Sequence, residues 1–287
     1  MEIIKRITNI FSGFEEKNYT KIFVNLNDVA FPILLSYIDN NTRQTIEPHL
    51  KDYFTWYNDH LYLLPTYNTP QKITEVFGVF AKILQEQGIL KLRGENIVLQ
   101  SVDGKHNFGH VDRALLHIFG LLAHGVHLNA YVEVNGTKHL WIARRSKTKI
   151  HDPLKLDNLV AGAVSLGYSD FDTLFKEAGE EAGIPQDLAV NAVLAKNIAY
   201  KVNKYGGLRN DIVHIFELSL PQDFIPTAVD GEVEEFFLME SSAVENMLIA
   251  DFEQFKYNSA LTILHFLYHH NLIKNLELHN FLDNLFN

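Results

Sequence analysis

Residues 175–184 read FKEAGEEAGI and concentrate negative charge on a segment that otherwise has the composition of a helix. Glu177, Glu180 and Glu181 fall at neighbouring helical positions, where like charges repel by roughly 0.2–0.5 kcal/mol per pair. A glycine inside the same helix costs about 1 kcal/mol relative to alanine. The total local penalty of roughly 1.5–2 kcal/mol suggests a functional reason for the cluster. A divalent cation would reverse the repulsion, whereas a solvated acidic helix face is the alternative explanation.

The composition limits the kind of ligand that such a chain binds. Its formal net charge of −10 disfavours a nonspecific hold on nucleic acid or on an anionic membrane, because both need a basic face. The chain has no cysteine, which excludes disulfides, thiolate zinc sites and a cysteine nucleophile. Hard cations with oxygen ligands are therefore the expected cofactors. No leader or membrane span is predicted either, which favours a cytoplasmic location.

The first part of the chain, residues 1–122, is expected to form a small α+β extension. A helix is predicted for residues 69–88, with Thr69 as its cap and Pro70 in its first turn. Apolar residues at helical spacing predict a second helix over residues 110–125. The extension is expected to be a lid over the site, a dimer surface or a part that only packs against the rest of the chain. A homodimer is therefore one of the arrangements left open.

The second part, residues 123–287, is expected to form an α/β (α+β) domain with a mixed sheet. Asn135 and Gly136 separate two strand-like runs and predict a hairpin. Further along, the order is strand, glycine loop, acidic helix and strand. Ser242 and Glu245 have the spacing of a capping box, and a last amphipathic helix is predicted from Asn258.

Residues 162–184, GAVSLGYSDFDTLFKEAGEEAGI, resemble the Nudix box, whose pattern is G-x5-E-x7-R-E-U-x-E-E-x-G-U with U a bulky apolar residue. The register holds without a gap. Two positions depart from the pattern, since Tyr168 replaces its first glutamate and Lys176 replaces its arginine. The outright matches are Gly162, Glu177, Glu180, Glu181, Gly183 and Ile184.

This resemblance implies an α/β/α sandwich and the metal-dependent hydrolysis of a diphosphate linked to another group. It implies that Glu177 and Glu181 bind Mg²⁺ or Mn²⁺, that Glu180 is a further ligand or the base, and that the Gly162 carbonyl often completes the metal shell. Lys176 keeps a positive charge among the catalytic residues but lacks the two-pronged geometry of arginine. Metal binding is therefore expected to survive, whereas the turnover rate stays open.

Segments outside the box narrow the resemblance. The runs GVHLNAYV, WIARRSKTK, LDNLVAG, DGEVEEF and NSALTILHFL are similar to the Nudix proteins related to the N-terminal half of fungal thiamine pyrophosphokinase. This similarity implies a diphosphatase that acts on thiamine diphosphate or its oxidised forms and releases the monophosphate and phosphate. Two alternatives stay open: a nucleoside diphosphate derivative as substrate, and a Nudix-fold binding module whose catalytic site is relaxed at Tyr168 and Lys176.

Charged residues outside the box are candidates for binding the substrate. Arg144 and Arg145 lie in a dense basic run and are expected to clamp a phosphate, with Arg209 as a weaker candidate. Glu232 or Glu235 is a candidate for an additional carboxylate. A solvated surface is the alternative explanation for both groups.

A thiamine-type ligand would also need aromatic and small polar residues around it. The extension offers Phe23, Trp56 and Tyr62 for such a wall. His127 and Asn129 precede the predicted hairpin and either face the pocket or serve a structural role, the latter being commoner for a lone histidine.

Overall fold

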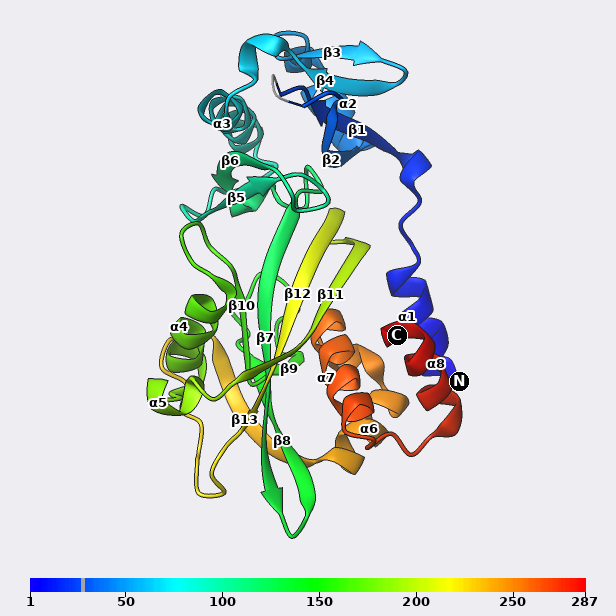
Figure 1. Cartoon of the computed structure of the whole chain (residues 1–287), viewed down its shortest axis with the longest axis vertical. Coiled ribbons are helices and arrows are strands. Elements are labelled where there is room, and N and C mark those ends of the chain that lie inside the picture. The colour runs from blue at the N-terminus through cyan, green and yellow to red at the C-terminus, as the bar shows by residue number, and fades with distance from the viewer. Residues whose placement is uncertain (27–28) are drawn as a thin grey trace.

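The computed structural model describes residues 1–26 and 29–287 and has a mixed α/β architecture, as the sequence predicted (Figure 1). Two sheets lie in the first part of the chain. A four-stranded sheet has the order β2-β1-β4-β3, and β5 and β6 form a two-stranded hairpin. The elements of this part are β1 (Tyr19–Val24), β2 (Ile33–Asp39), α2 (Asn40–Leu50), β3 (Phe54–Tyr57), β4 (His60–Leu63), α3 (Pro70–Glu86), β5 (Asn96–Gln100) and β6 (Asn107–Asp112).

A seven-stranded mixed sheet forms the second part of the molecule. Its main path is β11-β12-β7-β8-β13, with β10 paired to β7 and β9 paired to β8. The strand β7 runs parallel to β12 but antiparallel to β8 and β10. The strands are β7 (Leu122–Val134), β8 (Thr137–Arg145), β9 (Leu156–Asn158), β10 (Val160–Ala163), β11 (Val193–Lys204), β12 (Gly207–Ser219) and β13 (Val233–Glu240).

Helices cover both faces of this sheet (Figure 1). On one face, α4 and α5 share an apolar cluster with alternate β7 residues such as Val126 and Leu128. On the other face, α1, α6, α7 and α8 share a second cluster with β12 residues such as Val213 and Ile215. This alternation is expected for strands that are buried on both sides. The helices are α1 (Glu2–Phe11), α4 (Asp170–Ala182), α5 (Gln186–Ala189), α6 (Ser241–Ala250), α7 (Tyr257–His269) and α8 (Leu276–Phe286).

Three local predictions are confirmed. The helix α3 is capped by the Thr69 side chain and has Pro70 in its first turn. The β7–β8 hairpin closes at Asn135 and Gly136, both with positive φ, as the turn chemistry requires. The helix predicted from Asn258 is α7, which starts at Tyr257, but it is buried on all sides and is followed by the amphipathic helix α8.

Two local predictions are wrong. The expected helix over residues 110–125 is the end of β6, a 3-10 turn and the start of β7, because the chain reverses at Gly120, where φ is +54°. The expected capping box is not formed, since α6 has no side-chain cap and Glu245 instead accepts the backbone N–H groups of Lys274 and Asn275.

The predicted order of strand, glycine loop, acidic helix and strand is formed by β10, residues 164–169 with Gly167 at positive φ, α4 and β11, and Gly162 itself lies in β10. Among the described residues, no helix is both long enough and apolar enough to cross a membrane. The helix α1 packs in the same apolar cluster as α6, α7 and α8. The division into residues 1–122 and 123–287 therefore stays a prediction, with α1 belonging by its contacts to the larger sheet.

Candidate functional site

The acidic helix α4 is fixed at both ends by its own sequence. Ser169 and Asp172 form a capping box at its start, with a Ser169 Oγ to Asp172 N distance of 3.0 Å. Gly183 ends the helix in the left-handed conformation, and its N–H bonds back to the last turn. Leu174, Ala178 and Ala182 are fully buried against the sheet. This packing fixes α4, and therefore its three glutamates, next to β10.

Glu177 lies directly over Gly162. A Cβ atom on Gly162 would come within 2.4 Å of the Glu177 Cγ and 2.8 Å of its Cδ. The strand therefore has room for this glutamate only because residue 162 has no side chain. Burial raises the pKa of the Glu177 carboxyl.

Glu181 is the most buried of the three glutamates, with 7% of its surface exposed. Its Oε2 accepts the backbone N–H of Ala161 on β10 at 2.8 Å, and it forms no ion pair within the described part of the chain. Burial raises the pKa of Glu181 to about 8. A buried carboxylate without a cation at its side is unfavourable when ionised, so a divalent cation would fit here.

Lys176 offsets part of the repulsion that the sequence predicted. Its Nζ lies 2.7 Å from Glu180 Oε2 and 3.3 Å from Glu177 Oε1. Glu180 is about half exposed, with 48% of its side chain accessible. Across residues 1–26 and 29–287, no three ligand atoms that include these glutamates lie within 4.8 Å of one another. The helix therefore presents two recessed carboxylates and one outer carboxylate, the outer one held by Lys176.

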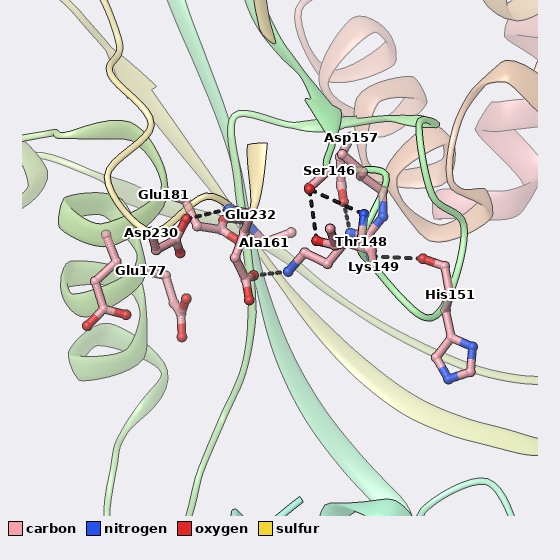
Figure 2. Close-up of polar contacts among 12 residues, drawn as sticks. Ser146, Thr148, Lys149, His151, Asp157, Ala161, Glu177, Glu181, Asp230 and Glu232 are labelled. Atoms are coloured by element: carbon pink, nitrogen blue, oxygen red, sulfur yellow. Dashed lines mark hydrogen bonds and ion pairs between the residues drawn. The ribbon is translucent and has the colours of Figure 1, made fainter. Parts of the chain in front are cut away.

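A loop that follows β8 brings a lysine to the same place (Figure 2). Lys149 forms an ion pair with Glu232, and burial lowers the pKa of this lysine. Glu181 and Asp230 are close enough to counter that shift by their negative charges. Of the two additional carboxylates predicted from the sequence, Glu232 thus lies at the site. Asp230 is a carboxylate that the sequence analysis missed, although it opens the DGEVEEF run that was singled out.

The extension also contributes a carboxylate, which sequence reasoning missed. Glu95 accepts a hydrogen bond from the Ser165 hydroxyl at 2.6 Å and pairs with Arg113. Its negative charge adds to the causes that raise the pKa of Glu177. The neighbouring Asn96 accepts the backbone N–H of Leu166 at 2.8 Å. No local pattern could have found Glu95, because it lies 70 positions before Ser165.

The arginines proposed to bind phosphate have other partners. Arg145 lies 2.7 Å from Asp157 in a nearly buried ion pair. Arg209 pairs with Asp211 at 2.9 Å.

Arg144 stacks over the Phe237 ring at 5.0 Å and lies 3.8 Å from Glu235. In the described residues, neither Arg144 nor Glu235 contacts the glutamates of α4. Their substrate-binding roles stay predictions. The side chain of the basic run that lies close enough to interact electrostatically with Glu181 is Lys149, which pairs with Glu232.

The other sequence candidates lie away from this site. His127 and Asn129 face the α7 side of the sheet, where the His127 Nδ1 lies 2.7 Å from Asn158 Oδ1 and Asn129 donates to the Thr262 carbonyl. Phe23 and Tyr62 stack on each other in the four-stranded sheet, at the end of the molecule far from α4 (Figure 1). That sheet also contains Trp56, under the Arg43 guanidinium.

The sheet is mixed and covered by helices on both faces, and the recessed carboxylates of α4 lie near a half-buried lysine, Lys149. Such a site suits a hard cation and an anionic small molecule. No family model matches the chain. The chain is 37% identical to Nudix hydrolase 24, chloroplastic, of Arabidopsis thaliana over 223 residues, which cover 77% of this chain and 60% of the plant protein. It is 36% identical to Nudix hydrolase 20, chloroplastic, of the same plant over 207 residues, or 71% of this chain and 55% of that protein.

The chain belongs to the Nudix superfamily, as these relatives and the gapless pattern of residues 162–184 show. It spans 60% and 55% of the length of the two plant proteins. Among solved structures, a C. elegans Ap4A hydrolase binary complex matches 53% of this chain and 99% of its own, at 14% identity and a TM-score of 0.39.

Proposed function

We propose that the chain is a metal-dependent Nudix hydrolase that cleaves a small-molecule diphosphate. The observation that carries this proposal is the pair of recessed carboxylates, Glu177 over Gly162 and Glu181 against the backbone of β10. Their oxygen atoms are the ligand type that Mg²⁺ and Mn²⁺ prefer. The catalytic roles of Glu177, Glu180, Glu181 and Lys176 are part of the proposal.

Each residue of the site has a distinct task in this scheme. Glu177 and Glu181 would hold the cation, together with the Gly162 carbonyl. The cation, when bound, would neutralise the diphosphate and orient it for attack by water.

The remaining tasks fall to side chains of the site that carry or accept protons. Glu180 is the outer carboxylate and is suited to accept a proton from water, while Lys176 keeps it in place at 2.7 Å. Lys149 is the basic side chain best placed to meet a phosphate oxygen, which would displace its partner Glu232.

The test is a substrate panel with the purified chain in the presence of Mg²⁺ or Mn²⁺. Thiamine diphosphate, its oxo and oxy forms and ADP-ribose are each assayed for release of a monophosphate or phosphate. Glu181→Gln and Glu177→Gln are expected to lower kcat by about 100-fold or more, because each removes a charge that would hold the cation. Glu133→Gln, an exposed acid that pairs with Lys138 on the β7–β8 hairpin, serves as the matched control. Unchanged turnover of Glu181→Gln, or full activity in EDTA, would contradict the proposal.

The finer assignment, thiamine diphosphate or an oxidised form of it, rests on the similarity to the proteins related to fungal thiamine pyrophosphokinase. A preference for nucleoside substrates in the panel would replace it. Ligand binding without any turnover would favour a binding module, for which Tyr168 and Lys176 are the motivating departures. The two plant relatives are described as chloroplastic, so a cytoplasmic location, like a homodimer, stays a proposal for this chain.

A further inference from the structure

A second group of possible metal ligands lies on the sheet face opposite α4. The helix α7 ends in His269 and is followed by His270, and both rings point at Glu217 on β12. The His269 Nδ1 lies 3.2 Å from one carboxylate oxygen, and the His270 Nε2 lies 2.8 Å from the other. One ligand atom from each of the three residues falls within 4.8 Å of the other two.

The structure holds Glu217 and His270 in place by packing. Glu217 is nearly buried, with 10% of its side chain exposed, and its side-chain partners in the described residues are the two histidines alone. The His270 ring packs against Phe266 at 4.4 Å and against Tyr131 at 5.8 Å. A buried carboxylate whose only partners are imidazoles lacks a formal counter-charge whenever the imidazoles are neutral.

We propose that Glu217, His269 and His270 bind a transition-metal ion of the Zn²⁺ type. Two imidazole nitrogens and one carboxylate oxygen form a donor set that suits Zn²⁺, whereas Mg²⁺ prefers oxygen ligands only. Ligands about 2.0–2.1 Å from a tetrahedral zinc lie about 3.4 Å apart. The 3.2 and 2.8 Å separations are to different oxygens of Glu217, so the carboxylate has to rotate to share one ion with both rings.

Another histidine lies nearby on the same helix, although it falls outside the group of three ligand atoms in the described residues. His265 lies one turn before His269, with the two ring centroids 5.6 Å apart. It is buried, and its Nδ1 has no hydrogen-bond partner in the described chain. The bound ion would connect the end of α7 to β12. Since β12 belongs to the larger sheet, the ion would also connect α7 to the sheet that carries the site at α4.

The experiment separates this ion from the one proposed at α4. Calorimetric titration with Zn²⁺ alone uses protein that carries Glu177→Gln and Glu181→Gln, so that the glutamates of α4 no longer compete. One equivalent of Zn²⁺ is expected to bind, and His269→Ala or Glu217→Gln in that background is expected to weaken its binding by at least about 10-fold. His110→Ala on β6 is the matched control and is expected to bind Zn²⁺ unchanged.

A second measurement guards against a folding artefact. The midpoint of thermal unfolding, Tm, of the protein that carries Glu177→Gln and Glu181→Gln is expected to rise with Zn²⁺ but not with Mg²⁺. His269 has 53% of its side chain exposed, so His269→Ala is expected to fold as shown by circular dichroism, and to lose the Zn²⁺-dependent rise in Tm. Zinc binding of equal affinity and stoichiometry in His269→Ala and Glu217→Gln would overturn the inference, whatever the outcome of the hydrolase assays.

Discussion

Gly162 sets the position of Glu177, because any side chain at residue 162 would meet that glutamate at 2.4 Å. Gly162→Ala is therefore expected to push the carboxylate away from β10. A displacement on the order of 1 Å at a catalytic group lowers turnover by about 100-fold, and overpacking lowers the free energy of unfolding by about 1–3 kcal/mol. Steady-state kinetics with Mg²⁺ and chemical denaturation measure the two effects.

Gly179 is the matched control, since it lies in the same helix but faces open space. No heavy atom lies within 4 Å of a Cβ built on it. Gly179→Ala is expected to raise the free energy of unfolding by about 0.5–1 kcal/mol and to leave turnover unchanged. If both alanine variants lost activity equally, the loss would reflect α4 as a whole and not the contact between Gly162 and Glu177.

At the scale of elements, Asp157 on β9 ties together β8 and the start of α7. Its carboxylate pairs with Arg145 at 2.7 Å and Lys256 at 3.3 Å and accepts the Ser259 hydroxyl. Asp157→Asn would leave two buried cations without their anion. The free energy of unfolding is therefore expected to fall by about 3–5 kcal/mol at pH 7, measured by urea denaturation.

The dependence of this effect on pH has a definite sign. Burial alone would raise the pKa of Asp157, but Lys256 and Arg145 outweigh burial and hold it below the ordinary value of 3.8. The stabilisation is therefore complete above pH 3.8 and is lost as the pH falls further. The difference between the original chain and Asp157→Asn should narrow in acid. Asp187→Asn, on the exposed start of α5, is expected to change stability by less than about 0.5 kcal/mol at any pH.

The sequence predicted elements well where their signals are local. The helix α4 has its cap, its apolar face and its terminal glycine within 15 residues, so a helix that carries the three glutamates could be foreseen. Over residues 110–125, the apolar positions are buried as predicted, but Gly120 packs against the Tyr37 carbonyl, where a Cβ would come within 2.4 Å. That contact forces a turn, and helical periodicity cannot reveal it because Tyr37 is distant in sequence.

The same limit explains the site residues that were missed. In the basic run, Arg144 and Arg145 end strand β8 and have other partners, whereas Lys149 lies in the following loop, close enough to interact electrostatically with Glu181. The composition of the run could not decide among them. Glu95 lies directly before β5 in the extension, and only the folded chain places it beside Ser165.

At the scale of the whole molecule, the hydrogen bond from Ser165 to Glu95 joins the extension to the loop between β10 and α4. A hydrogen bond to a charged group stabilises a protein by about 1.5–3 kcal/mol, so Ser165→Ala is expected to lower the free energy of unfolding by about that amount. It is also expected to lower turnover, because the loop leads into α4. Ser242→Ala removes an exposed serine-to-glutamate bond at the start of α6 and should change neither quantity. If Ser165→Ala and Ser242→Ala had equal turnover, the contact between Ser165 and the extension would have no role in catalysis.

The first helix packs with the larger sheet, although it lies before the predicted boundary at residue 122. Ile3 and Ile7 of α1 are 1% exposed and belong to the apolar cluster beneath α6, α7 and α8. Ile7→Ala is therefore expected to lower the free energy of unfolding by about 2–5 kcal/mol, the usual range for a buried isoleucine, whereas Thr8→Ala on the exposed face of α1 should be near neutral. Because this cavity would open under the larger sheet, Zn²⁺ binding and turnover with Mg²⁺ should both weaken together with stability. A stability loss below about 1 kcal/mol in Ile7→Ala would show that α1 is dispensable and that residues 123–287 stand without it.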